Sequence, residues 1–196
     1  MNVGVDEAGR GCVFGAVYAA AVIWNDEIVN EYIKDSKKLT KKRRQIMFDF
    51  VKEHAIDYGI GFATAKEIDE LNILQATQLA MHRAIDYLTV DFDHIYVDGN
   101  CFNYYYSQNS KEYKQHTCII KGDSLVKSIS AASILAKVSH DNYIEEISEQ
   151  YKNYNIDSNM GYCTQKHIDA IQKYGRTFEH RHTFKMPFEK HVLNYG

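Results

Sequence analysis

Short apolar runs alternate with longer segments of helical periodicity along most of the chain. Five of these runs have the length and composition of β-strands, and they cover residues 3–5, 16–24, 55–64, 94–97 and 116–121. The run at 16–24 is apolar throughout. This is typical of a strand that is covered on both faces, or of a second strand that forms a hairpin with the first.

Apolar residues recur three or four positions apart in four other segments, and the predicted helices cover residues 40–54, 72–88, 125–151 and 164–174. In the first of these helices we expect Ile46, Phe50 and Val51 to point inward. Thr64 and Glu67 have the spacing of a capping box. Strands that alternate with helices indicate an α/β fold with a central mixed β-sheet flanked by helices.

Two further segments complete the predicted fold. Residues 99–115 are polar and rich in Tyr and Asn, and they are predicted to form a loop. Residues 152–196 are predicted to form a small C-terminal helical segment, in which Gly175 ends the last helix. With 196 residues and 45% hydrophobic content, the chain can bury one substantial core, so we expect residues 1–196 to form one domain.

Composition narrows the function classes. Asp6 and Glu7 stand where a secretory leader would be basic and then apolar, and no apolar run approaches the ~20 residues of a membrane span. A cytoplasmic location without a membrane partner is therefore expected. The cysteines are widely spaced without a CxxC pair, which argues against a zinc knuckle or a redox dithiol; they are Cys12, Cys101, Cys118 and Cys163.

Charge limits how the chain could contact nucleic acid. The net charge is −3 and the isoelectric point is near 6.3, which argues against coating of nucleic acid by bulk positive charge. Any such contact must be local. The candidate segment is 34–44, which holds seven Lys and Arg residues and includes Lys37 and Lys38, although a basic run is also typical of a solvated helix face.

The first strand leads directly into the sequence DEAGRG at residues 6–11. The carboxylates of Asp6 and Glu7 are suitable oxygen ligands for a hard divalent cation. The glycines beside Arg10 permit backbone N–H groups to approach a phosphate closely. This combination favours metal-assisted chemistry on a phosphodiester, although a strand-end turn with solvated charges would have the same appearance.

Further carboxylates follow two later strands. Asp98 comes directly after the strand at 94–97, and Asp123 comes shortly after the strand at 116–121. Strand ends from distant parts of the chain can meet at one edge of a sheet, where the carboxylates would repel one another. Bound Mg²⁺ or Mn²⁺ offsets such repulsion, and a pair of ions is suited to phosphodiester hydrolysis. We therefore predict that Asp6, Glu7, Asp98 and Asp123 converge.

Ordered motifs along nearly the whole chain resemble the ribonuclease HII family, the type 2 ribonucleases H. These motifs are VGVDEAGRG at 3–11, DSKKLT at 35–40, EIDELNILQAT at 67–77, AMHRAI at 80–85, VDGN at 97–100, KGDSLVKSISAASILAKVSHD at 121–141, GYCTQKHIDAIQKYG at 161–175 and HRHTF at 180–184. The resemblance implies a ribonuclease H-like fold. It also implies a hydrolase that cleaves RNA in RNA/DNA hybrids and nicks duplex DNA on the 5′ side of embedded ribonucleotides, leaving 3′-hydroxyl and 5′-phosphate ends.

The same resemblance implies roles for individual residues. The acids that match the family's catalytic, metal-binding set are Asp6, Glu7, Asp98 and Asp123. Two ions, Mg²⁺ or Mn²⁺, would act during catalysis. Asp141 matches a supporting family aspartate, and His140 stands where that motif usually has arginine. Roles in ribonucleotide excision and RNA primer removal are implied, and a monomer is expected.

Substrate contacts are implied in the same way. Gly9, Arg10 and Gly11 match the family's GRG motif, which reads the ribose 2′-hydroxyl and flanking phosphates through main-chain groups. Tyr162 matches the tyrosine that stacks on the deoxyribose on the 3′ side. Lys37 and Lys38 are expected to hold a phosphate. His167, His180 and Arg181 are assigned backbone contacts or structural hydrogen bonds.

The chain departs from the family pattern at two turns. Cys12 and Cys163 stand where the family has proline, which predicts a less rigid opening turn and leaves the placement of Tyr162 open. The alternatives are a ribonuclease HIII-like hybrid nuclease and a catalytically silent hybrid-binding module. Arg10 within the GRG motif favours ribonuclease HII over HIII, and the presence of all four acids argues against a silent module.

Overall fold

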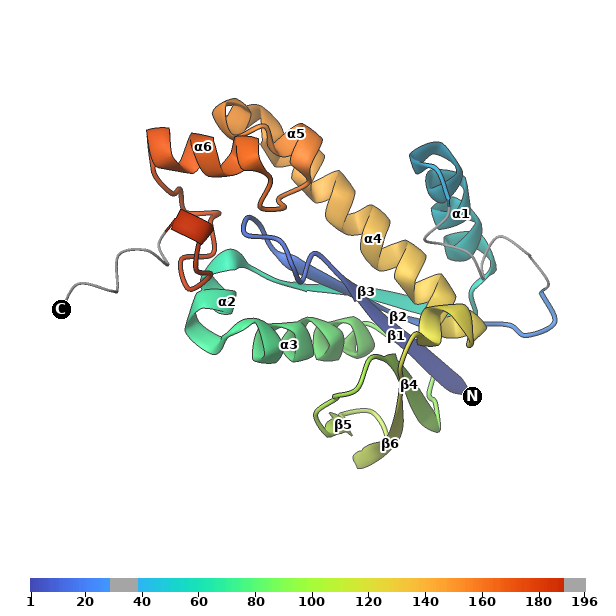
Figure 1. Cartoon of the computed structure of the whole chain (residues 1–196). Coiled ribbons are helices and arrows are strands. Elements are labelled where there is room, and N and C mark those ends of the chain that lie inside the picture. The colour runs from blue at the N-terminus through green and yellow to red at the C-terminus, as the bar shows by residue number, and fades with distance from the viewer. Residues whose placement is uncertain (29–38, 189–196) are drawn as a thin grey trace.

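A computed structural model describes residues 1–28 and 39–188. Among these residues, one six-stranded sheet has the strand order β3-β2-β1-β4-β6-β5 (Figure 1). Its strands are β1 (Asn2–Ala8), β2 (Val17–Ile23), β3 (Asp57–Ala63), β4 (His94–Asp98), β5 (Tyr105–Ser107) and β6 (Glu112–Ile119). The strand predictions are thus confirmed for all five apolar runs, with shifted ends.

The sheet is mixed, as predicted. β2 pairs antiparallel with β1 on one side and with β3 on the other, and β5 pairs antiparallel with β6. β4 lies parallel to both β1 and β6. The register of β1 and β4 pairs Val5 with Val97. Asp6 and Asp98 come directly after this pair, so two distant carboxylates are brought to the same end of the sheet.

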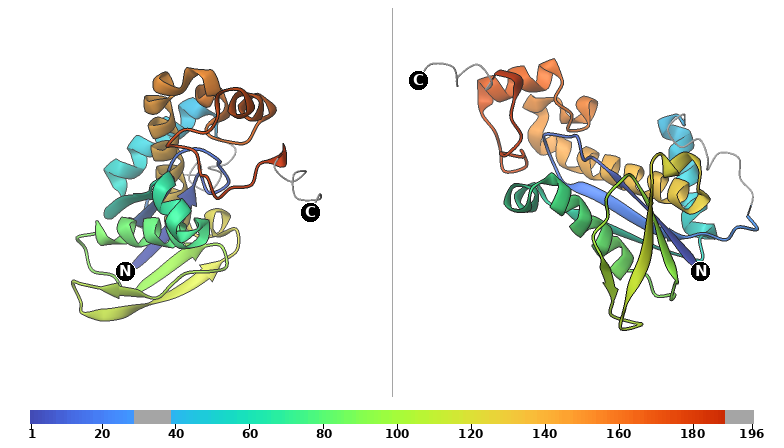
Figure 2. Two further views of the ribbon diagram at one scale, coloured as in Figure 1. Left: turned by 90° about the vertical axis from the view of Figure 1, so that its left-hand side faces the viewer. Right: turned by 60° about the horizontal axis from the view of Figure 1, so that its bottom comes forward.

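Helices cover both faces of the sheet (Figures 1 and 2). The α-helices are α1 (Lys41–His54), α2 (Ala65–Leu71), α3 (Ile73–Asp86), α4 (Lys127–Ser148), α5 (Ile156–Asn159) and α6 (Gln165–Tyr174), and the 3₁₀ helices include η2 (Gly122–Ser124) and η3 (Glu149–Tyr154). α4 packs on β1 and β2, and α1 lies against α4. α3 packs on β2 and β3 from the opposite face.

β2 contributes to the hydrophobic core on both of its faces. Ala19 and Ala21 belong to the cluster beneath α3, whereas Ala20 and Val22 belong to the cluster beneath α4. All four side chains are fully buried. The uninterrupted apolar run at 16–24 is therefore explained by burial on both faces as well as by the hairpin with β1.

The predicted helix starts are confirmed by their caps. The Thr40 hydroxyl accepts a hydrogen bond from the Arg43 N–H at the start of α1. Thr64 and Glu67 form a complete capping box at α2, with the Glu67 carboxylate accepting from the Thr64 N–H at 2.9 Å. At the start of α6, the Thr164 hydroxyl accepts a hydrogen bond from the His167 N–H. Such caps satisfy N–H groups that the first helical turn leaves unpaired.

Three predictions of detail are wrong. Residues 99–115 contain β5 and the first residues of β6 rather than loop alone, because Tyr105 packs into the core and Tyr106 packs edge-on against Tyr113 across the hairpin. Ile46 does not point inward; it is 58% exposed, whereas Met47 and Val51 are buried. The long helix α4 ends at Ser148 and gives way to η3.

The chain after α4 packs against the loop that joins β1 to β2. Val13 and Phe14 of this loop share a third hydrophobic cluster with Ile156 and Ile171 from the C-terminal helices. Phe14 also forms an isolated β-bridge with His180. The C-terminal segment is thereby held next to the sequence that follows DEAGRG. Within the described residues, no helix has the length and apolar character required to cross a membrane.

We predict that Gly4→Ala destabilises the protein severely. A Cβ at Gly4 would lie 2.2 Å from the Ser128 carbonyl carbon, because α4 approaches β1 backbone to backbone at this point. We expect a loss of about 3 kcal/mol or more in the free energy of unfolding, or a melting temperature lower by about 6–12 °C. Urea or thermal denaturation measures this, with Asn2→Ala, an exposed residue of the same strand, as control. Equal stability of both variants would contradict the close packing.

Candidate active site

A cavity of about 450 Å³ lies where the ends of β1 and β4 meet the start of the β1–β2 loop and the middle of α4. Its walls are formed by Asp6, Glu7, Ala8, Gly9, Arg10, Gly11, Arg44, Asp98, Ser133, Ile134, Lys137 and Tyr162. Three of the four predicted catalytic acids and the whole GRG turn therefore share one cavity with the predicted junction tyrosine. These lining residues come from five separate parts of the sequence.

Asp6 is the most deeply buried acid of the cavity wall. Its Oδ1 accepts the Glu7 N–H at 2.7 Å, and Ser133 of α4 also hydrogen-bonds to its carboxylate. Burial raises the pKa of Asp6 well above the ordinary value, and the neighbouring carboxylates of Glu7 and Asp98 raise it further. The site therefore concentrates negative charge where water cannot screen it well.

Glu7 lies beside the first cationic group of the cavity. Its Oε1 is 3.6 Å from Nη1 of Arg10. Burial raises the pKa of Glu7, the Arg10 guanidinium opposes that shift, and Asp98 adds to it. Both Asp6 and Glu7 lie inside β1, which extends to Ala8, and not after the strand as we predicted. The strand continues because Asp6 and Glu7 pair with Ala20 and Ala19 of β2.

Asp98 ends β4, as predicted. Its Oδ1 accepts the Gly122 N–H at 2.7 Å, so η2 fixes the orientation of this carboxylate. Asp123 follows in η2 and is also buried. It is not among the residues that line the cavity. Three of the four predicted acids therefore line one cavity, and the fourth lies one residue from a direct hydrogen-bond partner of Asp98.

The GRG turn depends on glycine at its first position. Gly9 has a φ of +82°, and a Cβ there would lie 2.4 Å from the imidazole ring of His140. Outside the helices and strands of the described part of the chain, the backbone N–H groups of Gly9, Arg10 and Gly11 donate no backbone hydrogen bond. Such N–H groups at a cavity wall are suited to bind an anion.

Tyr162 faces this turn across the cavity. A Cβ on Gly11 would lie 3.8 Å from Cε1 of Tyr162, whose side chain is 44% exposed. Gly161 has a φ of +81°, and its carbonyl accepts the Val13 N–H at 2.9 Å. The tyrosine is thereby held beside the β1–β2 loop although Cys163 replaces the family's proline.

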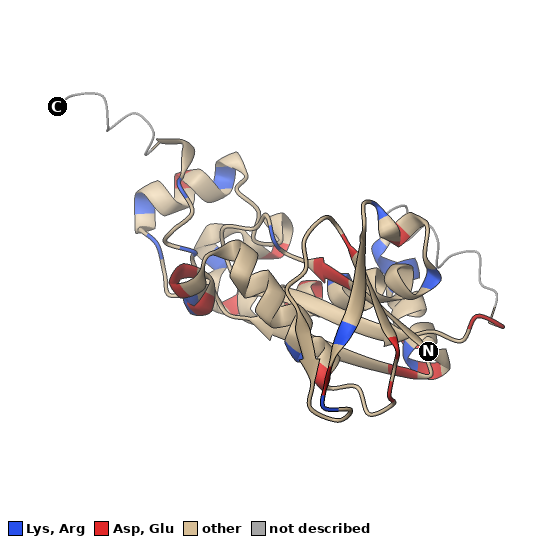
Figure 3. Ribbon diagram, turned by 90° about the horizontal axis from the view of Figure 1, so that it is seen from below, with Lys and Arg blue, Asp and Glu red and all other residues tan. Residues whose placement is uncertain are grey.

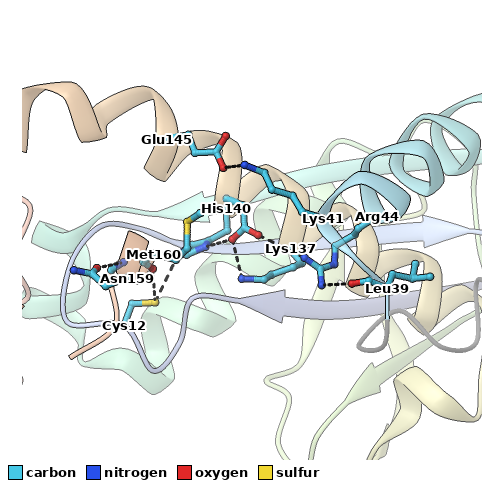
Figure 4. A network of polar contacts seen from close by, with 11 residues as sticks. Cys12, Leu39, Lys41, Arg44, Lys137, His140, Glu145, Asn159 and Met160 are labelled. Atoms are coloured by element: carbon cyan, nitrogen blue, oxygen red, sulfur yellow. Dashed lines mark hydrogen bonds and ion pairs between the residues drawn. The ribbon is translucent and has the colours of Figure 1, made fainter. Parts of the chain in front are cut away.

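Cys12 also ties the opening turn to its surroundings in place of the family's proline. Its buried thiol donates to the Met160 carbonyl at 3.3 Å, and its Sγ is 3.8 Å from Nε2 of His140 (Figure 4). Burial raises the pKa of the Cys12 thiol to about 11. The thiol is consequently protonated near neutral pH and serves as a hydrogen-bond donor.

Asp141 organises the basic side of the cavity. Its carboxylate lies 2.8 Å from Nζ of Lys137, 3.8 Å from Nη1 of Arg44 and 3.3 Å from Nδ1 of His140. Arg44 also donates to the Leu39 carbonyl (Figure 4). Although burial opposes ionisation of Asp141, His140 and Lys137 lower its pKa overall. Asp141 therefore holds two cations at the cavity wall without belonging to that wall itself.

Arg44, Lys137 and Ser133 line the cavity but were not predicted as site residues. The available signals were the position of Lys137 four residues before Asp141 on one helix face, and of Arg44 in the basic run. Figure 3 shows the Lys and Arg residues of α1 as blue bands on that helix. Lys37 and Lys38, which we expected to hold a phosphate, lie outside the described residues.

The sequence of this chain is similar to that of a known family along most of its length. The sequence model of the family described as Ribonuclease HII matches residues 3–191. The ribonuclease HII of Christiangramia forsetii is 49% identical over 185 residues, which cover 93% of this chain and 89% of that protein. The chain belongs to the ribonuclease HII family.

Solved structures show the same fold. The crystal structure of ribonuclease H2 from Pyrococcus horikoshii matches with a TM-score of 0.75 and 28% identity, over 94% of this chain and 93% of the other. A structure of Bst-RNase HIII in complex with Mn²⁺ matches with a TM-score of 0.70 and 17% identity, over 96% of this chain and 68% of the other. The predicted ribonuclease H-like α/β fold is confirmed.

Membership of the family establishes the class of activity. The chain is a ribonuclease H, an endonuclease of the hydrolase class that acts on RNA/DNA hybrids. The alternative of a catalytically silent module is thereby ruled out, and the family match is to ribonuclease HII and not to HIII. Enzymes of this family depend on divalent metal ions.

The donor set of the cavity fits such an ion chemically. Asp6, Glu7 and Asp98 supply carboxylate oxygens, which Mg²⁺ and Mn²⁺ prefer, and their mutual repulsion gives a cation a reason to bind. Within the described part of the chain, no three His, Cys, Asp or Glu side chains already stand in an arrangement that could hold a metal ion.

We predict that Asp6→Asn stabilises the metal-free protein while weakening metal binding. Because the folded-state pKa of Asp6 lies above the unfolded value, its ionisation opposes folding as the pH rises from the unfolded pKa through the folded one. Asn removes that charge. In EDTA at pH 8 we expect Asp6→Asn to have a higher melting temperature than the wild type. The increase should be about 2–4 °C for each 1 kcal/mol gained in the free energy of unfolding. The difference should shrink towards pH 3, where both states bind the proton.

Differential scanning calorimetry with EDTA, Mg²⁺ or Mn²⁺ provides the measurement. Added metal should raise the melting temperature of the wild-type protein more than that of Asp6→Asn. Asp49→Asn, on the exposed face of α1, is the matched control and should respond to metal as the wild type does. A lower melting temperature for Asp6→Asn than for the wild type at pH 8 in EDTA would contradict carboxylate repulsion in this cavity.

Proposed function

We propose that this ribonuclease H nicks duplex DNA on the 5′ side of a single embedded ribonucleotide, in addition to cleaving RNA/DNA hybrids. The products are a 3′-hydroxyl on the upstream strand and a 5′-phosphate on the ribonucleotide. The observation that carries the proposal is the shared cavity. Acids for phosphodiester hydrolysis, the GRG turn and Tyr162 all line it, so the scissile phosphate and the sugars on both sides of a junction can be contacted together.

Recognition of the ribose is assigned to the GRG turn. The backbone N–H groups of Gly9, Arg10 and Gly11 line the cavity and are suited to the 2′-hydroxyl and to adjacent phosphate oxygens. The aromatic ring of Tyr162 is suited to stacking on the following deoxyribose, which lacks a 2′-hydroxyl. A junction from RNA to DNA can therefore make both contacts, with the ribose at the GRG turn and the deoxyribose at Tyr162.

Binding of the backbone is assigned to cations around the cavity. Arg44 and Lys137 present positive charge within it, and Asp141 fixes both side chains. Lys37 and Lys38 belong to the same basic run and are proposed to hold a further phosphate. Such contacts set the register of the substrate without reading its sequence.

Two divalent ions, Mg²⁺ or Mn²⁺, are proposed to be held by Asp6, Glu7, Asp98 and Asp123. When bound, they supply activation of the attacking water and stabilisation of the departing 3′ oxygen. Asp6 is buried near Glu7 and Asp98, whose charges raise its pKa, and it would hold a cation together with them. η2 orients Asp98 through the Gly122 N–H and also carries Asp123, so one short helix positions two of the four acids.

The wider proposals follow from this activity. Residues 1–196 are proposed to act as one catalytic domain, in which about residues 152–196 form a substrate-binding segment that carries Tyr162. The protein is proposed to work as a cytoplasmic monomer in ribonucleotide excision and RNA primer removal. Each of these statements rests on nicking at embedded ribonucleotides.

The test is cleavage of a labelled DNA duplex with one ribonucleotide, beside an all-DNA duplex and a long RNA/DNA hybrid, in Mg²⁺, Mn²⁺ or EDTA. We expect metal-dependent nicking directly 5′ of the lone ribonucleotide and no cleavage of the all-DNA duplex. Cutting of the long hybrid alone would contradict the proposal and would indicate a preference for continuous RNA tracts.

Asp98→Asn and Asp123→Asn test the roles of the acids. We expect each to lower kcat/KM by more than about 100-fold, the upper range for residues that merely support metal ligands, while binding of the ribonucleotide duplex survives in a gel-shift assay. Asp49→Asn is again the matched control and should retain activity. Full activity of either acid variant would remove that residue from the catalytic set.

A further inference from the structure

Arg181 is completely buried beneath the GRG turn, and its side chain contacts carbonyl groups instead of a carboxylate. Its exposed fraction is 0%. Nε donates to the Gly15 carbonyl at 2.9 Å, and Nη2 donates to the Gly9 carbonyl at 2.8 Å. Nη1 donates to the carbonyls of Arg10 at 3.0 Å and Cys12 at 2.6 Å. One planar guanidinium group therefore fixes four peptide groups of the β1–β2 loop.

The four hydrogen bonds of Arg181 compensate for the burial of its positive charge. Within the described residues, no carboxylate lies at ion-pair distance from Arg181. An unpaired buried cation is unfavourable unless hydrogen bonds compensate it. Because the carbonyls of Gly9 and Arg10 are held towards Arg181, their peptide groups have little freedom to turn over. The positive charge also lies directly behind the turn that is proposed to meet a phosphate.

His180 connects the same segment to Tyr162 through a second histidine. His167 Nδ1 lies 2.9 Å from the Tyr162 carbonyl, so it must carry the proton and donate. At the other end, the Thr177 N–H donates to His180 Nδ1 at 2.8 Å, so this nitrogen must accept. The two Nε2 atoms are 3.1 Å apart. His180 Nε2–H therefore donates to His167 Nε2, and both rings are neutral.

This chain of hydrogen bonds runs in one direction, from Thr177 through His180 and His167 to the Tyr162 carbonyl. Both imidazoles are fully buried. Their burial lowers the pKa of each ring, that of His180 to about 3. The chain therefore keeps one protonation pattern across the neutral pH range and holds the Tyr162 peptide in one orientation.

The backbone around His180 and Arg181 joins the two hydrogen-bond systems. The Arg181 N–H donates to the Val13 carbonyl at 2.9 Å, and the Gly15 N–H donates to the Glu179 carbonyl at 2.7 Å. Arg181 thus hydrogen-bonds to the GRG turn, and its neighbour His180 is linked through His167 to Tyr162. This dipeptide therefore links the two elements, in addition to the Val13 N–H bond to the Gly161 carbonyl.

We propose that His180 and Arg181 are positioning residues that hold the GRG turn and Tyr162 at a fixed separation, and thereby set the preference for a ribonucleotide–deoxyribonucleotide junction over continuous RNA. This inference rests on the proposed function, in which the turn meets the ribose and Tyr162 meets the next sugar. A change in their separation affects a junction substrate most, because only that substrate needs both contacts. Neither residue touches the reacting atoms.

A pair of substitutions at one position tests the proposal. In His180→Gln, the side-chain amide reaches the position of Nε2 and can still donate to His167. In His180→Asn, the amide reaches only the position of Nδ1, so the donor to His167 is lost. The readout is the ratio of kcat/KM on a duplex with one ribonucleotide to kcat/KM on a continuous hybrid. Misfolding lowers both values equally and leaves this ratio unchanged.

We expect His180→Asn to lower the ratio about tenfold, mainly through a higher KM for the junction substrate. His180→Gln should remain within about threefold of the wild type, as should the control His54→Gln at the end of α1. Arg181→Lys retains the charge but loses the fork of donors, and should also lower the ratio. If His180→Asn fails to fold, as judged by circular dichroism, Arg181→Lys carries the test.

If His180→Asn folds and keeps the wild-type ratio, the inference is overturned. If only Arg181→Lys folds, an unchanged ratio in that variant overturns it. His180 and Arg181 would then have only a structural role. That result differs from failure of the proposed function. If the proposed function fails, the wild-type protein does not nick the single-ribonucleotide duplex. If only this inference fails, the wild-type protein prefers the junction and the variants keep that preference.

Discussion

The parallel pairing of β1 with β4 is the constraint on which the site depends. It places Asp6 and Asp98 directly after the paired residues Val5 and Val97, and the close approach of α4 at Gly4 buries the first of these acids. Burial and like charge then raise the pKa of Asp6. The fold thus holds carboxylates where they repel one another, and the packing of the sheet and α4 must offset that repulsion in the absence of a cation.

A second level of organisation surrounds these acids. Asp141 restrains Arg44 and Lys137 at the basic wall, and η2 restrains Asp98 through the Gly122 N–H. The C-terminal segment restrains the GRG turn and Tyr162 together. Most of the groups proposed to contact the substrate are thus held in place by neighbouring groups. Such preorganisation favours one defined geometry for the reaction.

Much of this could be predicted from the sequence because the signals are local. Apolar runs identified the strands that carry Asp6 and Asp98, and the caps at Thr40, Thr64 and Thr164 gave the helix starts. The β5–β6 hairpin was missed because paired tyrosines, rather than an apolar run, stabilise it. The contacts of Arg181 were foreseen only in general terms, since the carbonyls that it binds lie more than 160 positions away in the sequence. Long-range contacts of this kind leave no periodic signal.

The most direct test of the central claim is a crystal structure of Asp123→Asn bound to a DNA duplex with one ribonucleotide. The account predicts the phosphate on the 5′ side of the ribonucleotide beside Asp6 and Asp98, with its 2′-hydroxyl at the N–H groups of Gly9–Gly11. The ring of Tyr162 should lie against the next deoxyribose. A duplex bound with the ribonucleotide outside this cavity, or with Tyr162 turned away from the junction, would contradict the claim that one cavity performs both recognition and hydrolysis.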